Sequence, residues 1–113
     1  MADVHETLER ALSALPCPAG RRPVADRPDT YVSWFEVLGQ PALHASNRIR
    51  RFERIMQVDI FSKQPIDGLR KEVLALLKEA GLIISSEGPE DYESDTRYRH
   101  LPITCSWLEK EDL

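Results

Sequence analysis

The sequence predicts an α+β fold, in which an antiparallel sheet of about four strands carries two helices on one face. The main observation is a change of hydrophobic period within residues 48–81. Met56, Val58 and Ile60 recur at every second position, which is typical of a strand with one buried face. After Pro65 the apolar residues recur at intervals of three and four, which is typical of one side of a helix. They are Ile66, Leu69, Val73, Leu76, Leu77 and Ala80, and Gly81 supplies the positive φ that commonly ends a helix.

The length of 113 residues fits a single domain over residues 1–113 with one hydrophobic core. The net charge of −4 argues against a surface devoted to nucleic acid, although it leaves room for a local basic patch. We find no stretch as long and apolar as a membrane span and no signal pattern. We therefore expect a protein that stays in the cytoplasm, or in an assembly formed there, with no membrane partner. Cys17 and Cys105 are expected to be free thiols in that compartment.

The first helix is predicted over Val4–Leu15. Asp3 is a suitable N-cap, and Glu6 three residues later completes a capping box. His5 lies off the apolar stripe of this helix, so we expect a solvated side chain there. The prolines and the glycine of residues 16–28 end the helix and predict an extended, mobile loop.

Two strands are predicted before the second helix. Aromatic and β-branched residues indicate a strand over Thr30–Leu38, and alternation places Val32, Trp34 and Leu38 on one of its faces. The next strand, Arg48–Phe61, would span about 45 Å at about 3.3 Å per residue, well beyond the usual length. We therefore expect either a bulge within it or a first half that extends beyond the body of the domain.

The C-terminal third adds up to two strands. Leu82–Ile84 predicts a short strand, Ser85–Asp95 an acidic loop and Thr96–Leu108 the last strand. Pro102 has no amide hydrogen, so the last strand is expected to lie at an edge or to be bulged there. Residues 109–113 form a short acidic tail that we expect to fray. The predicted order of elements is α-β-β-α-(β)-β.

Opposite charges gather on two separate segments of the chain. If both are exposed, the arginines of one copy can meet the carboxylates of the next, and such a heterologous contact closes into a ring when the rotation permits. The alternative is a charged strand that only discourages edge-on aggregation. The candidate subunit-interface residues are Arg48, Arg50, Arg51 and Arg54 on the long strand and Glu87, Glu90, Asp91, Glu93 and Asp95 in the acidic loop.

No group of residues predicts a complete active site. His100 follows the acidic loop, but no serine or cysteine stands at a spacing that suggests a triad. The alternative from a different class is a small metal-dependent hydrolase that uses Asp91, Glu93, Asp95 and His100. The loop lacks the glycine and the closing glutamate of a calcium site, so we expect no catalytic residues, no metal and no cofactor. A nucleic-acid-binding module is a further alternative, although the arginine strand lacks interleaved aromatic residues.

Three stretches together carry a resemblance to a known family. They are residues 58–62 (Val-Asp-Ile-Phe-Ser), the helix end at Ala80-Gly81, and the start of the last strand. Over roughly residues 28–108 the chain resembles the tail terminator, or tail-to-head joining, proteins of long-tailed phages and prophages. The residues that match the recurring phrase of that family are Tyr92, Glu93, Asp95, Thr96, Tyr98 and His100.

The resemblance implies a virion protein without catalytic activity, assembled in the host cytoplasm. Six copies would form a ring at the head-proximal end of the tail tube, stop tube polymerisation and offer a surface to the head connector. The implied partners are further copies of this chain, the tail tube protein and the connector or stopper protein. Genome DNA would pass through the lumen without sequence-specific contact, and the acidic loop is the candidate for lining that lumen. The alternative in the same class is a head-side completion or stopper protein of the connector.

Overall fold

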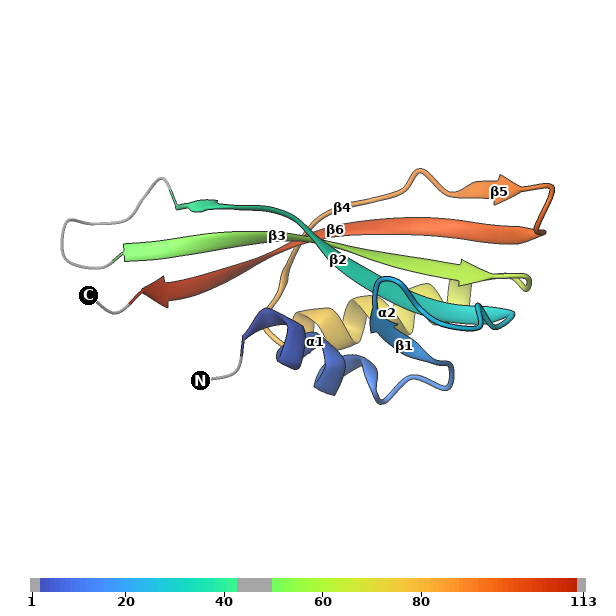
Figure 1. The fold of residues 1–113 in the computed structure, drawn as a ribbon, viewed down its shortest axis with the longest axis horizontal. Helices are drawn as coiled ribbons and strands as arrows, with labels where there is room; N and C mark the ends of the chain where they lie inside the picture. The colour runs from blue at the N-terminus through green and yellow to red at the C-terminus, as the bar shows by residue number, and fades with distance from the viewer. Residues whose placement is uncertain (1–2, 43–49, 112–113) are drawn as a thin grey trace.

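The computed structural model describes residues 3–42 and 50–111, which form one six-stranded sheet with two helices on the same face (Figure 1). The strand order across the sheet is β1-β2-β3-β6-β4, and β5 pairs with the start of β6. The α+β class and the two helices on one face are therefore confirmed. The elements are α1 (Val4–Leu12), β1 (Ala19–Arg21), β2 (Thr30–Pro41), β3 (Arg50–Ser62), α2 (Asp67–Glu79), β4 (Ile83–Glu87), β5 (Asp91–Glu93) and β6 (Tyr98–Glu111).

The sheet is larger than the prediction and mixed rather than antiparallel. Strand β1 lies in residues 16–28, which were predicted as a loop, and it runs parallel to β2 with Ala19 opposite Val32. Strand β5 lies inside the predicted acidic loop and pairs Asp91 with His100. The prediction of about four strands was wrong in these two places. Strands of three residues have no measurable hydrophobic period, so only their partners in the sheet reveal them.

Helix α1 begins as predicted but ends earlier. The Asp3 carboxylate accepts a hydrogen bond from the Glu6 amide at 2.8 Å, which confirms the N-cap. The helix ends at Leu12 rather than Leu15, yet Leu15 remains buried against the core. Helix α2 ends at Glu79, and Gly81 follows its C-cap, Ala80, with a φ of +98°.

The core lies between the helices and one face of the sheet. Alternate residues of β2, β3 and β6 point toward the helices, and each fully buried side chain of this size contributes about 1.5–3 kcal/mol. We call the opposite sheet face the back face. The core residues are Val4, Leu8, Leu12, Leu15, Val32, Trp34, Met56, Val58, Ile60, Ile66, Val73, Leu77, Leu82, Leu101, Ile103 and Cys105.

The three long strands continue beyond the helices as a projecting arm, which we define as residues 36–41 of β2, 50–55 of β3 and 107–111 of β6 (Figure 1). No described residue of the arm belongs to the buried core. The expectation that the first half of the long strand leaves the domain body is thus confirmed. The bulge lies instead in β2, where the register shifts between Glu36 and Leu38. It places Leu38 opposite Ile55 on the back face, so the predicted grouping of Leu38 with Val32 and Trp34 was wrong.

The segment between β1 and β2 is packed on the back face rather than free. The Tyr98 hydroxyl lies 2.8 Å from the Arg27 carbonyl oxygen and 2.7 Å from that of Pro28. The Arg22 guanidinium lies 5.1 Å from the centroid of the Phe35 ring. The segment therefore has contacts with the sheet, and its mobility stays a prediction.

The C-terminal strand accommodates its proline between two partners. Strand β5 pairs with residues 98–100 of β6 and β4 with residues 103–106, so Pro102 lies between these two ladders. Its carbonyl oxygen accepts a hydrogen bond from the Gly88 amide at 2.8 Å. Strand β6 continues to Glu111, beyond the predicted end at Leu108, and fraying of the tail stays a prediction. Residues 112–113 lie outside the described residues.

Candidate interaction surfaces

The two charged segments lie at opposite ends of the sheet. The arginine segment pairs with the end of β6, where Arg50 is opposite Glu111. The acidic segment lies beside the start of the same strand, where Asp91 is opposite His100. Within the described part of the chain, no ion pair joins the two segments of one subunit (Figure 1). Arg48 lies outside the described residues, as does the side chain of Arg50.

Arg54 links all three strands of the arm on the side that faces the helices. Its Nε donates to Glu109 of β6 at 2.8 Å, and its Nη1 lies 3.2 Å from Glu36 of β2. The guanidinium also lies 4.6 Å from the centroid of the Phe52 ring. The hydrogen bond that Arg54 donates to Glu109 is the main cause that raises the pKa of Arg54. Arg54 therefore has partners inside its own subunit, whereas Arg51 is exposed.

Several acidic residues also have partners inside the subunit. Glu87 forms an ion pair with Arg70 at 3.0 Å, and Glu90 lies 3.9 Å from Arg99. Glu93 accepts a hydrogen bond from the Thr96 hydroxyl at 3.0 Å. Asp91 and Asp95 are exposed and have no ion-pair partner among residues 3–42 and 50–111. Pairing of the two charged segments between copies stays a prediction.

The residues of the family phrase divide between the surface and the packed sheet. Tyr92 is exposed beside Arg99, whose guanidinium lies 5.7 Å from its ring centroid. Tyr98 is buried and meets the rings of Tyr31 and Phe61 edge-on. In the family phrase, Glu93 and Thr96 therefore stabilise the turn by a side-chain hydrogen bond, and Tyr98 holds the segment before β2.

His100 pairs with a buried carboxylate that sequence spacing did not single out. Its Nε2 lies 2.7 Å from Asp59 Oδ1, and the same oxygen accepts a hydrogen bond from Gln57 at 2.8 Å. The Asp59 side chain is 3% exposed, and the imidazole stacks on Phe61 at a centroid distance of 4.4 Å. The pair lines a back-face cavity of about 420 Å³, together with Arg22 and Arg27. Neither Asp95 nor Glu93 of the acidic loop is the partner of His100.

His5 is partly buried rather than solvated, because Trp34 Nε1 donates a hydrogen bond to its Nδ1 at 3.2 Å. Desolvation is the main cause that lowers the pKa of His5, and the positive charge of Arg21 adds to it. The prediction that His5 faces water was wrong. Because Nδ1 accepts this hydrogen bond, it carries no proton of its own, and the neutral imidazole is the form that suits this site.

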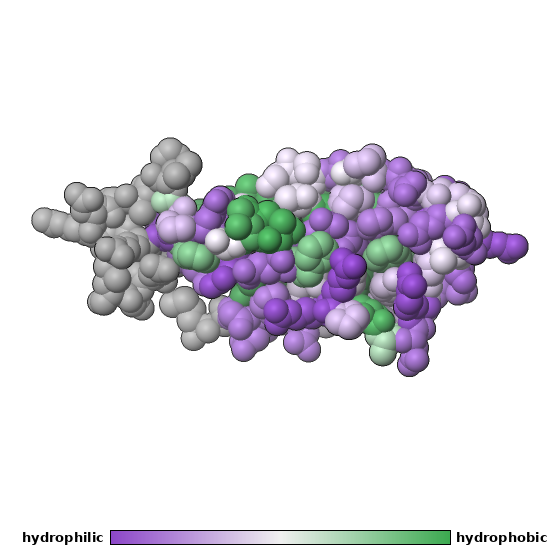
Figure 2. Space-filling view, turned by 45° about the horizontal axis from the view of Figure 1, so that its top comes forward, coloured by the Kyte–Doolittle hydropathy of each residue, from purple (hydrophilic) through white to green (hydrophobic). Residues whose placement is uncertain are grey.

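An apolar row crosses the back face where the arm leaves the domain body. The register places Leu38 opposite Ile55, Ile55 opposite Ser106, and Ser106 opposite Ile83. We call Leu38, Ile55, Ile83 and the nearby Leu108 the back-face apolar row. Leu38 is 50% exposed, Ile83 57% and Leu108 43%. Figure 2 views the molecule more from the back-face side and shows a hydrophobic patch among mostly hydrophilic side chains.

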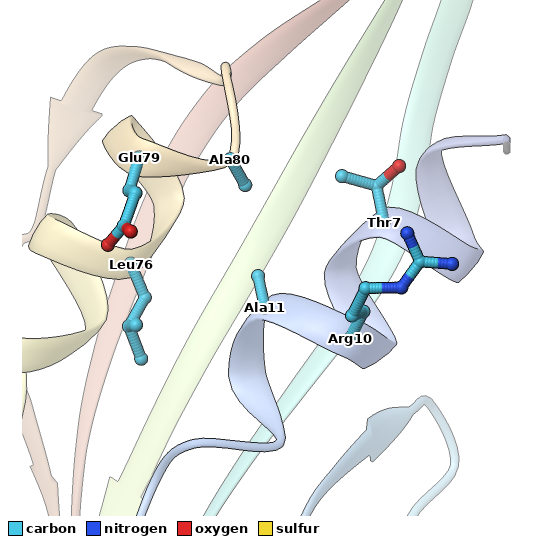
Figure 3. Close-up of a pocket in the computed structure, with 6 residues that line it drawn as sticks. All are labelled: Thr7, Arg10, Ala11, Leu76, Glu79 and Ala80. Carbon is cyan, nitrogen blue, oxygen red and sulfur yellow. The ribbon is translucent and has the colours of Figure 1, made fainter.

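A second apolar hollow lies between the two helices. Its volume is about 390 Å³, and Figure 3 shows Thr7 and Ala11 of α1 facing Ala80 beyond the end of α2. Leu76 also lines it, and Arg10 and Glu79 stand at its sides. The small alanine side chains leave this hollow open because neither fills the space between the helices.

The described residues contain no group that resembles a metal site. Across 3–42 and 50–111, no three His, Cys, Asp or Glu side chains converge as metal ligands would. The residues of the hydrolase alternative, Asp91, Glu93, Asp95 and His100, therefore do not form a ligand set. Cys17 and Cys105 are free thiols, as predicted. No described helix is long and apolar enough to cross a membrane.

Comparison with known proteins gives a likeness in fold. A chain in the solved structure described as "Virion of native gene transfer agent (GTA) particle" is similar to this one with a TM-score of 0.66. The two chains are 11% identical, and the match covers 96% of this chain and 95% of that chain. No protein-family model and no curated protein sequence matches. The likeness therefore shows a shared fold over nearly the whole of both chains.

Some residues of these surfaces gave no signal in the sequence. Glu36 and Glu109 stand far apart in the chain, and only the three-stranded arm brings them to Arg54. Nothing in the sequence around Leu38 and Leu108 indicates that their side chains are exposed. The strand alternation could have identified Leu108 as facing the side away from Trp107, but Leu38 could be placed only once the bulge was known.

Proposed function

We propose that this chain is a structural protein of a phage-like virion, a ring-forming tail terminator at the head-proximal end of the tail tube. In this role it stops tube polymerisation and joins the tail to the head connector. Its partners are other copies of itself, the tail tube protein and the connector or stopper protein. Genome DNA passes through the lumen of the ring, with the acidic residues 87–95 as the candidate lining.

The observation that carries the proposal is the fold shared with a virion chain over 96% of this sequence. The family phrase from Tyr92 to His100 supports the finer assignment to a tail terminator, because the resemblance rests on these residues. The hydrolase alternative receives no support from the described residues, since its four side chains do not converge. His100 is held instead by Asp59, in an arrangement that fixes β3 to β6.

The projecting arm supports assembly with other chains. Three strands without a covering layer are marginal in water unless one face is buried. Beyond Trp107, no helix among the described residues lies over either face of the arm, and Leu38 and Leu108 remain about half exposed. A partner that covers the back-face apolar row supplies the missing layer, and the charges around it set the orientation.

The test combines mass measurement with imaging. Light scattering on the purified protein, alone and with tail tubes of the same particle, is expected to reveal a closed oligomer. Negative-stain images of those tubes are expected to show added density at one end only, together with a defined tube length. A protein that stays monomeric and never associates with tubes would refute the proposal.

The same images separate the tail-side role from the head-side alternative. A terminator labelled with a gold-binding tag is expected at the head-proximal end of isolated tails. A stopper protein would be absent from isolated tails and present on isolated heads. Label on heads alone would therefore replace the terminator by the connector-side alternative.

A further inference from the structure

The arm has two open strand edges, one on each side. Among residues 3–42 and 50–111, β1 pairs with residues 32–34 of β2, and no described strand lies beside the outer edge of β2 from Phe35 onward. On the outer edge of β6, the pairing with the described strands β5 and β4 ends at Ser106. Between these edges, β3 is paired on both sides along the arm. Open edges present unpaired amide and carbonyl groups and are templates for another strand.

The backbone groups on these edges can be assigned from the neighbouring hydrogen bonds. The Val32 amide donates to Pro18 and the Trp34 carbonyl accepts from Arg22, so even-numbered residues of β2 before the bulge point outward. Glu36 continues that alternation on the open edge. On β6, the Pro102 carbonyl faces outward toward Gly88. Alternation then directs the amide and carbonyl of Leu108 away from β3.

The directions of the two edge strands suit a cyclic arrangement. Strand β3 is antiparallel to both β2 and β6, so the two edge strands run parallel to each other. Rotation about an axis that lies along the strands preserves their direction. A second copy can therefore bring its β2 edge beside the β6 edge of the first as a parallel pair. Each copy offers one edge of each kind, which makes the contact heterologous and able to close.

The side chains near the two edges suit the same contact. Leu38 lies on the back face close to the β2 edge, and Leu108 lies on that face at the β6 edge. They are 50% and 43% exposed, and a parallel edge pair would set the leucine of one copy near the leucine of the next. The ion pairs of Arg54 hold the three strands of each arm together beneath that contact.

From these observations we propose that copies of this chain assemble by β-strand addition, with Leu38–Pro41 of one copy beside Trp107–Glu109 of the next, the stretches that lie at the same height along the strands. The occupant of each open edge is the other edge of a second copy. The resulting sheet runs continuously from arm to arm around the ring. This inference rests on the proposed ring, and it adds the edges that make the contact. The bulge after Glu36 and the proline at position 41 limit the pairing to a short stretch.

Cross-linking between two introduced thiols tests the contact. In a Cys17→Ser background, Leu38→Cys and Leu108→Cys are combined in one chain and treated with a short bismaleimide. Cys105 is fully buried and stays unreactive in the folded protein. The double variant is expected to give a ladder of covalent oligomers on a denaturing gel, because each copy links to the next. Either single variant is expected to stay monomeric on the same gel.

The controls identify which statement fails. Dimers from Leu108→Cys alone would indicate a two-fold contact and overturn the proposed pairing. A ring seen by light scattering without a ladder from the double variant would overturn edge pairing and leave the proposed function intact. A protein that never oligomerises, even with tail tubes, would overturn both.

A matched pair of substitutions tests the backbone contribution. Leu108→Pro removes an outward amide hydrogen that β3 does not use, whereas Leu108→Ala removes the same side chain and keeps the amide. Leu108→Pro is expected to weaken association about tenfold more than Leu108→Ala does, because it removes one backbone hydrogen bond from each contact. Melting of both variants confirms that they fold. Equal association by two folded variants would contradict the pairing.

Discussion

Substitution of Arg54 tests whether the charges of the arm act within one subunit or between subunits. Its guanidinium bonds to Glu109 at 2.8 Å and to Glu36 at 3.2 Å, and it lies 4.6 Å from the centre of the Phe52 ring. The Arg54 side chain is 33% exposed and each carboxylate 29%, so solvent screens these pairs in part. Arg54→Ala would leave two partly buried carboxylates on the arm without a counter-ion.

The magnitude follows from the three contacts. Two partly exposed ion pairs contribute about 0.2–1 kcal/mol each, and the contact with the ring adds about 0.5 kcal/mol. We therefore expect Arg54→Ala to lower the free energy of unfolding by about 1–2 kcal/mol. For a chain of this length that corresponds to a fall in Tm of about 4–8 °C. Part of the effect should disappear at about 1 M salt, where screening acts over about 3 Å.

The assay is denaturant unfolding of the monomer, followed by tryptophan fluorescence, at low and high salt. Arg54→Met serves as the matched control, because it keeps the apolar stem and removes only the charge. A double-mutant cycle with Glu109→Gln is expected to give a coupling energy of about 0.5–1 kcal/mol. If Arg54→Ala leaves the monomer unchanged but prevents oligomerisation, the arginine serves a neighbouring copy and the reasoning is refuted.

Three further predictions concern packing, pH and thiol reactivity. Gly39→Ala places a methyl group 2.7 Å from the Phe52 ring and should lower the free energy of unfolding by about 1 kcal/mol. Gly20→Ala, where the nearest atom is 3.8 Å away, should have a smaller effect, and chemical denaturation of both variants checks this. Because the folded state lowers the pKa of His5 below its usual 6.5, stability should be full above about pH 6.5 and fall as the pH drops below it. The comparison is a series of melts between about pH 7.5 and 5.5 for the wild type and for His5→Asn, which should lack this component because asparagine does not titrate. Burial raises the pKa of the Cys105 thiol to about 12, so a maleimide should label the half-buried Cys17 first in the native protein. Mass spectrometry measures the labelling, and equal labelling of Cys105 would show that strand β6 opens.

The parts of the fold that were predictable are those whose signal is local. The period of α2, the N-cap of α1 and the alternation of β3 each depend on residues within a few positions of one another. The projection of the long strand was also predictable, because its length alone exceeds what a small domain can cover. Free thiols at Cys17 and Cys105 followed from their number and spacing.

The errors share one cause, which is that the deciding feature lies in the contact between two elements and leaves no pattern in the local sequence. Strands β1 and β5 have three residues each, too few to carry a period, and they exist because an edge of β2 or β6 lies beside them. The bulge in β2 reverses the side on which Leu38 lies, and the residues around it look like those of any other strand. His5 gained its partner only when α1 packed beside β2.

By itself, the sequence determined that this protein has two amphipathic helices, a strand too long for its domain and no spacing typical of a complete active site. Tertiary structure alone decided the partners of the charged residues. Arg54 lies between carboxylates that are 18 and 55 positions away, and His100 meets Asp59 at a separation of 41. Periodicity reports how one segment divides its surface between core and water, whereas ion pairs and open edges depend on which segments lie side by side.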